Sequence, residues 1–153
     1  MTQTQRGFTL IELIATITLM ALVLTTAPAA YEKIRDAMSF RAAIADTTSA
    51  LKRARVAAVL QGHPVELAVH LEQHQLHTPG EKTVSIDSRI TLDMHGVISL
   101  SNPDLPVFRF YPDGSATGGS LTLTTPTGRA QRIEIDWFTG QLLLSHPPTE
   151  AAS

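Results

Sequence analysis

A long apolar segment near the N-terminus constrains this chain more than any other feature. Residues 8–30 carry a single charge, on Glu12, and residues 13–31 carry none. The 23 residues from 8 to 30 would span roughly 34 Å as a helix at about 1.5 Å each, enough to cross a bilayer core. A buried helix of a soluble protein is rarely apolar on all sides over this length. A secretory signal would be shorter, and its only small-x-small site here, Ala27-Pro28-Ala29, has proline at its centre. We therefore predict a transmembrane helix.

Glu12 is the informative residue within this segment. A carboxylate near the centre of a membrane helix costs about 2.5–3.5 kcal/mol on insertion scales. One interpretation is that Glu12 lies near the helix end, where water or lipid headgroups reduce this penalty. The other is that it meets a positive partner within the bilayer, such as a free α-amino group on a neighbouring subunit. Position and charge alone leave both interpretations open.

The segment Arg6-Gly7-Phe8-Thr9-Leu10-Ile11-Glu12-Leu13 resembles the class III leader of type IV pilins and type II secretion pseudopilins. The resemblance implies that a prepilin peptidase cleaves after Gly7 and methylates the new N-terminal Phe8. It also implies that Glu12 pairs with the N-terminus of a neighbouring subunit during assembly. Glycine suits the cleavage position because it lets an extended backbone enter a protease site. Pro28 has a counterpart in many pilins, where a proline bends the long helix.

The orientation in the membrane follows from the resemblance and not from the charges. Arg6 is the only basic residue of the leader, whereas Lys33 and Arg35 follow the apolar segment closely. Counting basic residues alone favours the opposite topology. The leader peptidase acts on the cytoplasmic side, so the resemblance implies a single-pass inner-membrane protein with its C-terminal head in the periplasm.

Residues 31–61 continue a helical pattern beyond the membrane segment. Apolar residues recur there near a spacing of 3.6, at Ile34, Ala37, Met38, Ile44, Ala45, Leu51, Ala54 and Ala58. Gly62 and Pro64 then predict the end of the helix. We expect one helix over residues 8–61 whose second part, the stem, packs against a globular head. A coiled coil is disfavoured, because Arg41 and Thr48 occupy positions that a heptad repeat would make apolar.

The pattern changes after Gly62 to short alternating runs separated by turn residues. The runs are residues 65–71, 83–86, 90–92, 97–100, 107–110, 121–124, 133–137 and 142–144. Many short strands at this spacing predict antiparallel structure, with two sheets packed face to face. The predicted fold class is therefore α+β, and the resemblance of the leader implies that it is pilin-like. It consists of a leader (1–7), a transmembrane half-helix (8–30), a stem helix (31–61), a periplasmic β head (62–146) and a flexible tail (147–153).

Two blocks of the head and stem resemble the minor pseudopilin H family of type II secretion systems. One block runs from Phe110-Tyr111-Pro112-Asp113-Gly114 to Gly118-Gly119 and continues with Ile133-Glu134-Ile135-Asp136-Trp137 and Thr139-Gly140. The other is Ala50-Leu51-Lys52-Arg53-Ala54-Arg55 through Val59. The resemblance implies a structural subunit at or near the tip of the periplasmic pseudopilus. Its partners would be the prepilin peptidase, other minor and major pseudopilins, and the inner membrane before assembly. The alternative is a minor type IV pilin acting in pilus assembly, twitching or DNA uptake.

Charge favours the secretion branch over a DNA-binding pilin. Residues 31–61 carry six basic and three acidic side chains, whereas residues 62–153 carry five basic and ten acidic ones. An acidic head repels phosphate, and a DNA receptor needs several basic residues on one face. Arg129 and Arg132 are too few, so no nucleic-acid partner is expected.

The residues that could hold a metal or phosphate all have simpler interpretations. His70, His74 and His77 would share a helix face, but they fall in a strand and turn region and are expected to be solvated turn histidines. Asp113 is read as a turn residue. Gly114 and the glycines at 118 and 119 lack the lysine and the helix pattern of a phosphate loop.

No arrangement of residues indicates catalysis. The chain has no cysteine and no G-x-S-x-G motif, and no pair of carboxylates stands out as acid and base. Trp137 and Phe138 are expected to lie in the core and at an edge of the sheet, although one aromatic could serve a subunit contact. We expect no enzyme activity, cofactor or metal.

Overall fold

The structure is a computed structural model of the 153-residue chain. It describes residues 8–96 and 106–147, except for the side chains of residues 23–30. Two compact units are present, residues 1–38 and residues 39–153, and each is described by itself. The predicted leader, the predicted strand at 97–100 and most of the predicted tail lie outside the described residues.

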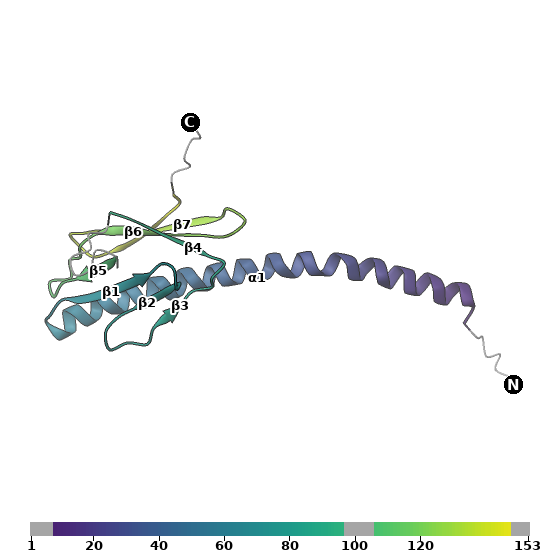
Figure 1. The fold of residues 1–153 in the computed structure, drawn as a ribbon, viewed down its shortest axis with the longest axis horizontal. Coiled ribbons are helices and arrows are strands. Elements are labelled where there is room, and N and C mark those ends of the chain that lie inside the picture. Colours follow the sequence, from purple (N-terminus) through teal and green to yellow (C-terminus); the bar gives the residue numbers. More distant parts are fainter. Residues whose placement is uncertain (1–7, 97–105, 148–153) are drawn as a thin grey trace, which may run out of the picture. The chain divides into compact units, whose positions relative to one another are not determined.

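A single helix, α1 (Leu10–Gln61), accounts for the N-terminal part of the chain (Figure 1). Thr9 caps its first turn, because the backbone N–H of Glu12 donates to the Thr9 carbonyl oxygen at 3.1 Å and lies 3.4 Å from its hydroxyl. Gly62 ends it in a left-handed conformation, with φ +69° and an N–H bonded to the Ala58 carbonyl at 3.1 Å. The predicted helix stop is thereby confirmed.

The predicted membrane segment receives only a partial description. Among the described residues, no helix combines the length and the apolar character needed to cross a membrane. Residues 23–30 have helical backbone, but their side chains lie outside the description. The bend expected at Pro28 therefore stays a prediction.

The strands form two antiparallel four-stranded sheets. Sheet A has the order β3-β2-β1-β5 and comprises β3 (Val84–Ser85), β2 (Gln75–His77), β1 (Val65–His70) and β5 (Val107–Phe110). Sheet B has the order β4-β6-β7-β8 and comprises β4 (Thr91–His95), β6 (Gly119–Thr124), β7 (Ala130–Ile135) and β8 (Leu142–Ser145). The prediction of a long helix with two antiparallel sheets is confirmed.

The strand bounds differ from the prediction at several strands. β4 and β6 were predicted at 90–92 and 121–124 but span Thr91–His95 and Gly119–Thr124, and β7 begins at Ala130 and not at Ile133. β2 was not predicted, since it is only three residues long and follows a turn in which His74 has φ +52°. β7 ends at Ile135 and not at Trp137, because Asp136 begins a turn.

The core of residues 39–153 lies between α1 and both sheets. The helix contributes buried small side chains at 43, 50, 54 and 58, together with Phe40 and Leu51. Alanine at these positions lets the strands approach the helix axis closely. The sheets contribute alternate residues, such as Leu67 and Val69 of β1 and Ile133 and Ile135 of β7. This packing positions the turns at the ends of the strands against α1.

Candidate functional site

The N-terminal residues that the sequence singled out lie at the start of α1. Gly7 is outside the described residues, and Phe8 precedes the helix with 83% of its surface exposed. Glu12 is in the first helical turn, where the helix dipole favours a negative charge. The structure thus brings Phe8 and Glu12 to the same end of the helix, within one turn of each other along the chain.

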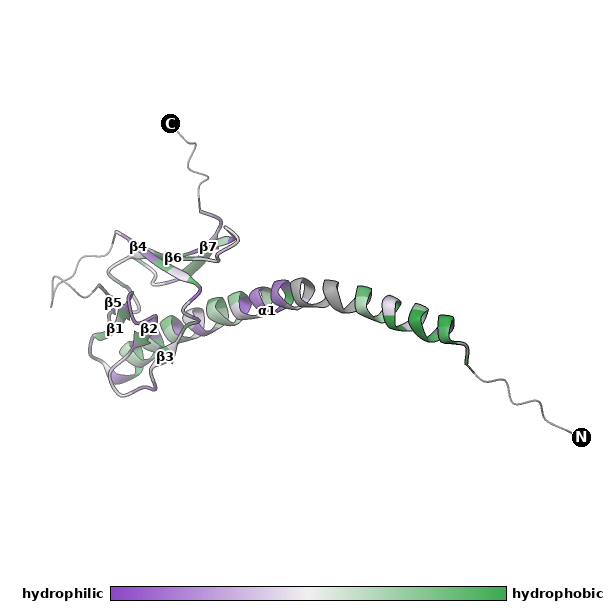
Figure 2. Ribbon diagram, turned by 45° about the vertical axis from the view of Figure 1, so that its right-hand side comes forward, coloured by the Kyte–Doolittle hydropathy of each residue, from purple (hydrophilic) through white to green (hydrophobic). Residues whose placement is uncertain are grey.

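Apolar side chains surround this first part of α1. Exposed Leu, Ile and Met side chains occur on every side of the described turns, which are green in Figure 2 (Leu10, Ile11, Leu13, Ile14, Ile17, Leu19, Met20 and Leu22). The hydroxyl groups among them bond within the helix. Thr16 donates to the Leu13 carbonyl at 2.8 Å, and Thr18 donates to the Ile14 carbonyl at 2.7 Å. Such internal bonding is what an apolar environment requires of polar groups.

In the head, Arg55 of α1 joins two turns that are distant in the sequence. Turn one is residues 111–115, and turn two is residues 136–140. Arg55 Nε donates to the Gly114 carbonyl at 3.0 Å, and Arg55 Nη2 donates to the Thr139 carbonyl at 2.8 Å. We call this arrangement the Arg55 clamp. It connects the stem helix to the residues that precede β6 and β8.

Turn one is closed by its own polar groups. The Gly114 N–H donates to the Tyr111 carbonyl at 2.9 Å, and Asp113 Oδ1 accepts the Ser115 hydroxyl at 2.6 Å and the Ser115 N–H at 3.0 Å. These bonds from Ser115 hold the pKa of Asp113 below its ordinary value. Asp113 is therefore a structural turn residue, as predicted from the sequence.

Turn two has a similar construction around Asp136. Asp136 Oδ1 accepts the Thr139 N–H at 2.7 Å, the Thr139 hydroxyl at 2.8 Å and the Phe138 N–H at 3.1 Å. The bonds from Thr139, and then that from Phe138, lower the pKa of Asp136. The Trp137 carbonyl accepts the Ala116 N–H at 3.0 Å, so the backbone also links the two turns.

Gly140 can only be glycine in this arrangement. A Cβ on Gly140 would lie 2.2 Å from the Gly114 carbonyl oxygen and 2.9 Å from Arg55 Nε, and its φ is +62°. At Gly118, with φ +76°, a Cβ would lie 3.1 Å from Trp137 Cβ. These contacts explain two glycines, at 118 and 140, of the block that resembles the pseudopilin H family.

Trp137 and Phe138 differ from the sequence prediction. The expectation that they lie in the core and at a sheet edge was wrong, since 67% of Trp137 and 71% of Phe138 are exposed on turn two. The Asp136 carboxylate accepts hydrogen bonds from the N–H groups of Phe138 and Thr139, so β7 ends before the aromatic residues. Their rings pack edge to face with centroids 5.6 Å apart. They are thus two ordered aromatic side chains on the surface of the head.

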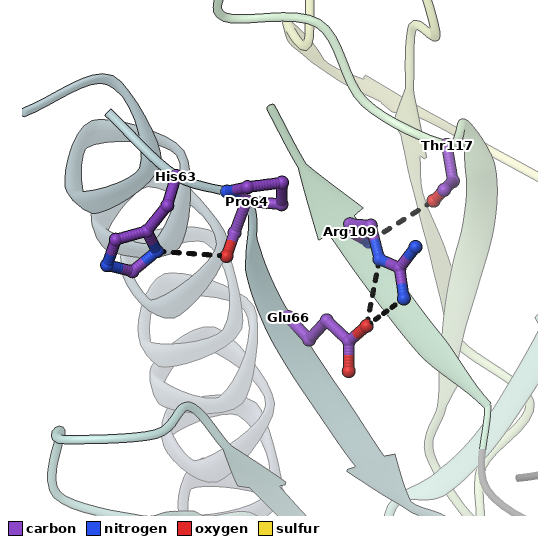
Figure 3. Close-up of polar contacts among 5 residues, drawn as sticks. All are labelled: His63, Pro64, Glu66, Arg109 and Thr117. Atoms are coloured by element: carbon purple, nitrogen blue, oxygen red, sulfur yellow. Dashed lines mark hydrogen bonds and ion pairs between the residues drawn. The ribbon is translucent and has the colours of Figure 1, made fainter. Parts of the chain in front are cut away.

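A cross-strand ion pair lies on sheet A (Figure 3). Arg109 of β5 stands directly opposite Glu66 of β1, and its Nε donates to Glu66 Oε1 at 2.8 Å while Nη2 donates to the same oxygen. Its backbone N–H donates to the Thr117 hydroxyl at 3.2 Å. The bond with Glu66 raises the pKa of Arg109 above its ordinary value. The pair joins β1 to β5.

The three histidines do not converge. His70 ends β1, His74 lies in the turn after it, and His77 belongs to β2 and not to a turn. His77 Nδ1 lies 3.2 Å from the Thr83 hydroxyl, whereas His74 Nδ1 lies 3.3 Å from the Glu72 carbonyl. Within residues 8–96 and 106–147, no group of three or more His, Asp or Glu residues is placed to hold a metal ion.

Comparison with known proteins agrees with this geometry. Residues 2–28 match the prokaryotic N-terminal methylation motif, and residues 43–140 match the family described as Type II transport protein GspH. The chain is 28% identical over 138 residues to the Type II secretion system protein H of Xanthomonas campestris pv. campestris, covering 90% of this chain and 81% of that relative. The minor pseudopilin EpsH from the Type 2 Secretion System of Vibrio cholerae has a similar fold. The TM-score is 0.54 at 14% identity, over 72% of this chain and 98% of EpsH.

A long N-terminal helix, two antiparallel sheets and an N-terminal methylation motif define a pilin-like protein. More specifically, the chain belongs to the GspH family of type II transport proteins.

The Arg55 clamp is the part of the site that sequence reasoning missed. Both blocks of the resemblance were recognised, but nothing in them indicated that Arg55 contacts Gly114 and Thr139. The one available signal is that Arg55 lies one turn after the predicted core residue Leu51, on a helix face that should be apolar.

The clamp predicts a difference between two glycine substitutions. Both Gly140→Ala and Gly128→Ala place a side chain at positive φ, at a cost of about 1–2 kcal/mol. A Cβ on Gly128 meets nothing within 4 Å, whereas a Cβ on Gly140 meets the Gly114 carbonyl. Overpacking of this kind costs a further 1–3 kcal/mol or so. Gly140→Ala should therefore lose more unfolding free energy than Gly128→Ala by this amount. Urea unfolding of the purified chain measures it, and equal losses would refute a role for close packing at Gly140.

The pKa of Asp136 predicts a pH dependence. Because its pKa is lowered in the folded state, its contribution to stability is present near neutral pH and is lost as the pH falls below about 4. Asp136→Asn keeps an acceptor oxygen but removes the charge. The unfolding free energy of the wild type should exceed that of Asp136→Asn at pH 7, and the gap should shrink towards pH 3. Asp46→Asn, at an exposed position of α1, serves as the control. If the difference in unfolding free energy between wild type and Asp136→Asn stays constant from pH 7 to pH 3, the charge of Asp136 does not stabilise turn two.

Proposed function

We propose that this chain is a minor pseudopilin, a structural subunit at or near the tip of the periplasmic type II secretion pseudopilus. The observation that carries the proposal is the presence on one chain of the methylation motif at residues 2–28 and of the GspH family match at residues 43–140. The role is assembly, and no catalytic step is assigned to the chain.

The first step concerns the leader. A prepilin peptidase removes residues 1–7 and methylates Phe8, which creates an N-terminal cation just before α1. Before assembly, residues 8–30 hold the chain in the inner membrane as a single span. The apolar side chains around the first turns of α1, and the bonding of Thr16 and Thr18 within the helix, support this placement.

The second step concerns Glu12. It lies in the first turn and is exposed there, so its carboxylate can meet the α-amino group of an adjacent subunit as the helix leaves the membrane. Neutralising the two charges lowers the cost of keeping both in an apolar helix bundle. The other minor pseudopilins and the major pseudopilin are the partners, and Pro28 bends the helix.

The described structure does not favour the alternative of a DNA-binding minor pilin. Three of the five basic residues of the head are engaged within it. Arg109 pairs with Glu66, Arg89 pairs with Asp87 at 2.6 Å, and the Arg129 guanidinium lies 5.7 Å from the Phe40 ring centroid. A nucleic-acid site requires such side chains to gather on one exposed face.

Two substitutions separate processing from assembly. Gly7→Leu should leave the leader attached, because the peptidase cannot accept a large side chain there. Glu12→Leu should be processed normally but should enter the filament poorly, because the N-terminal cation of the neighbour loses its partner. Glu12→Asp, which keeps the charge, is the matched control.

Gel mobility reports processing, and cysteine crosslinking to the other pseudopilins reports incorporation. Normal processing of Gly7→Leu would refute the cleavage site. Wild-type incorporation of Glu12→Leu would refute the charge pairing.

A further inference from the structure

The exposed apolar surface of residues 39–153 is confined to two places. In the described part of this unit, large hydrophobic side chains are exposed at the end of α1 and in the segment from turn two to β8 (Val56, Val59, Leu60, Trp137, Phe138, Leu143 and Leu144). Single exposed apolar residues are ordinary, but a concentration of them marks an interaction surface. The polar strands elsewhere on the head show no such concentration among the described residues.

A cleft connects these two places. Lys52, Arg55 and Val56 of α1 form one wall, Gly140, Gln141 and Leu142 form the other, and the volume is about 380 Å³. The cleft therefore lies between the stem helix and the start of β8. The Arg55 clamp forms part of its lining, so its shape is fixed before any partner binds.

β8 is the edge strand of sheet B. It pairs with β7 on one side, and no other described strand pairs with its second side. Edge strands are commonly protected by lysine, proline or a bulge. β8 reads Leu-Leu-Leu-Ser and has none of these. The opposite edge, β4, instead carries exposed Asp93 and His95.

The strand register shows what an additional strand would cover. Leu142 and Leu144 stand opposite Ile135 and Ile133, whose side chains are buried in the core at 2% and 0% exposure. Leu144 lies on the same face of sheet B as these buried side chains but is 57% exposed. The core-facing side of sheet B thus continues beyond the part that α1 covers. A strand paired with β8 would place alternate side chains over the cleft and over Leu144.

The charge of the cleft indicates the chemistry of that strand. Its lining contains Lys52 and Arg55 and no acidic residue. Arg53, the third basic residue of this part of α1, pairs with Glu81 at 2.9 Å and does not line the cleft. Lys52 is exposed beside Val56. A carboxylate on the added strand would complement this wall, and apolar side chains would cover Val56 and Leu144.

We propose that β8 accepts an extended segment of a neighbouring pseudopilin as a fifth strand of sheet B. The segment carries apolar side chains at alternate positions over the cleft and an acidic side chain that pairs with Lys52. Trp137 and Phe138 flank it as aromatic anchors. A second copy of this chain is a poor occupant, because residues 141–147 contain no acidic residue. The inference rests on the proposed function, since it requires neighbouring filament subunits.

The test uses the full chain in its host, with the chromosomal copy deleted. A photo-crosslinking amino acid replaces Leu143 on β8 or, as the matched control, Asp93 on the opposite edge of the same sheet. Mass spectrometry identifies the crosslinked peptides. The expected result is a crosslink from position 143 to an acidic segment of another pseudopilin and none to that segment from position 93.

Two further variants test the contact itself. Leu144→Lys places a charge on the strand edge, and Lys52→Glu reverses the charge of the cleft wall. Each should reduce the crosslink yield at position 143 by at least about tenfold, the scale of a lost interface contact. In the Lys52→Glu background, replacing the acidic residue of the crosslinked peptide by lysine should restore the crosslink, because the two charges are then exchanged.

Asp93→Lys controls for added charge on sheet B, and protease resistance of the full chain monitors folding. Lys52→Glu keeps the test informative if Leu144→Lys misfolds.

Several results would overturn the inference. These are a crosslink from position 143 only to residues 148–153 of the same chain or to a second copy, no crosslink at all, or unchanged yields in both variants. Export of enzymes by the strain that lacks the chain would refute the proposed function. A different result would refute only the strand addition. In that case the deletion strain fails to export, whereas Leu144→Lys and Lys52→Glu both restore export and both leave the crosslink yield at position 143 unchanged.

Discussion

The placement of turns one and two against the stem helix depends on the two hydrogen bonds that Arg55 donates to the carbonyls of Gly114 and Thr139. Strands packed on a helix by apolar contacts alone could slide, because such contacts are not directional. A guanidinium with a fixed fork of donors specifies both position and angle. The bond distances, and the absence of any side chain on Gly140, set how closely the two turns approach. The family block in turns one and two is therefore a docking element for the helix.

The same constraint determines what the head presents to its surroundings. Asp136 ends β7 by accepting backbone N–H groups, and turn two then exposes Trp137 and Phe138. β8 follows immediately and leaves its outer edge without a partner among the described strands. The structural contacts of turn two thus hold aromatic residues and a strand edge in a fixed orientation, as a subunit of a filament requires. At the other end of the chain, Thr9 and Glu12 organise the first turn of α1 next to Phe8.

Local patterns predicted most of the fold. The end of α1 at Gly62, the alternation of β1 and the bounds of β5 all follow from residues adjacent in the sequence. The leader motif similarly singled out Phe8 and Glu12. The failures have physical causes. The alternation of β7 continues through Trp137, but Asp136 binds the following N–H groups and stops the strand. The contacts of Arg55 span 59 and 84 residues, and no periodicity reports contacts at such separations.

If this chain is a subunit of the type II secretion pseudopilus, its host needs it for protein export. The most direct test is to delete it from its host and measure the fraction of an exported enzyme that reaches the medium. We expect the enzyme to accumulate in the periplasm of the deletion strain and the wild-type chain to restore its export. Normal export by the deletion strain, with a loss of twitching or transformation, would contradict a role in secretion and would assign the chain to a pilus.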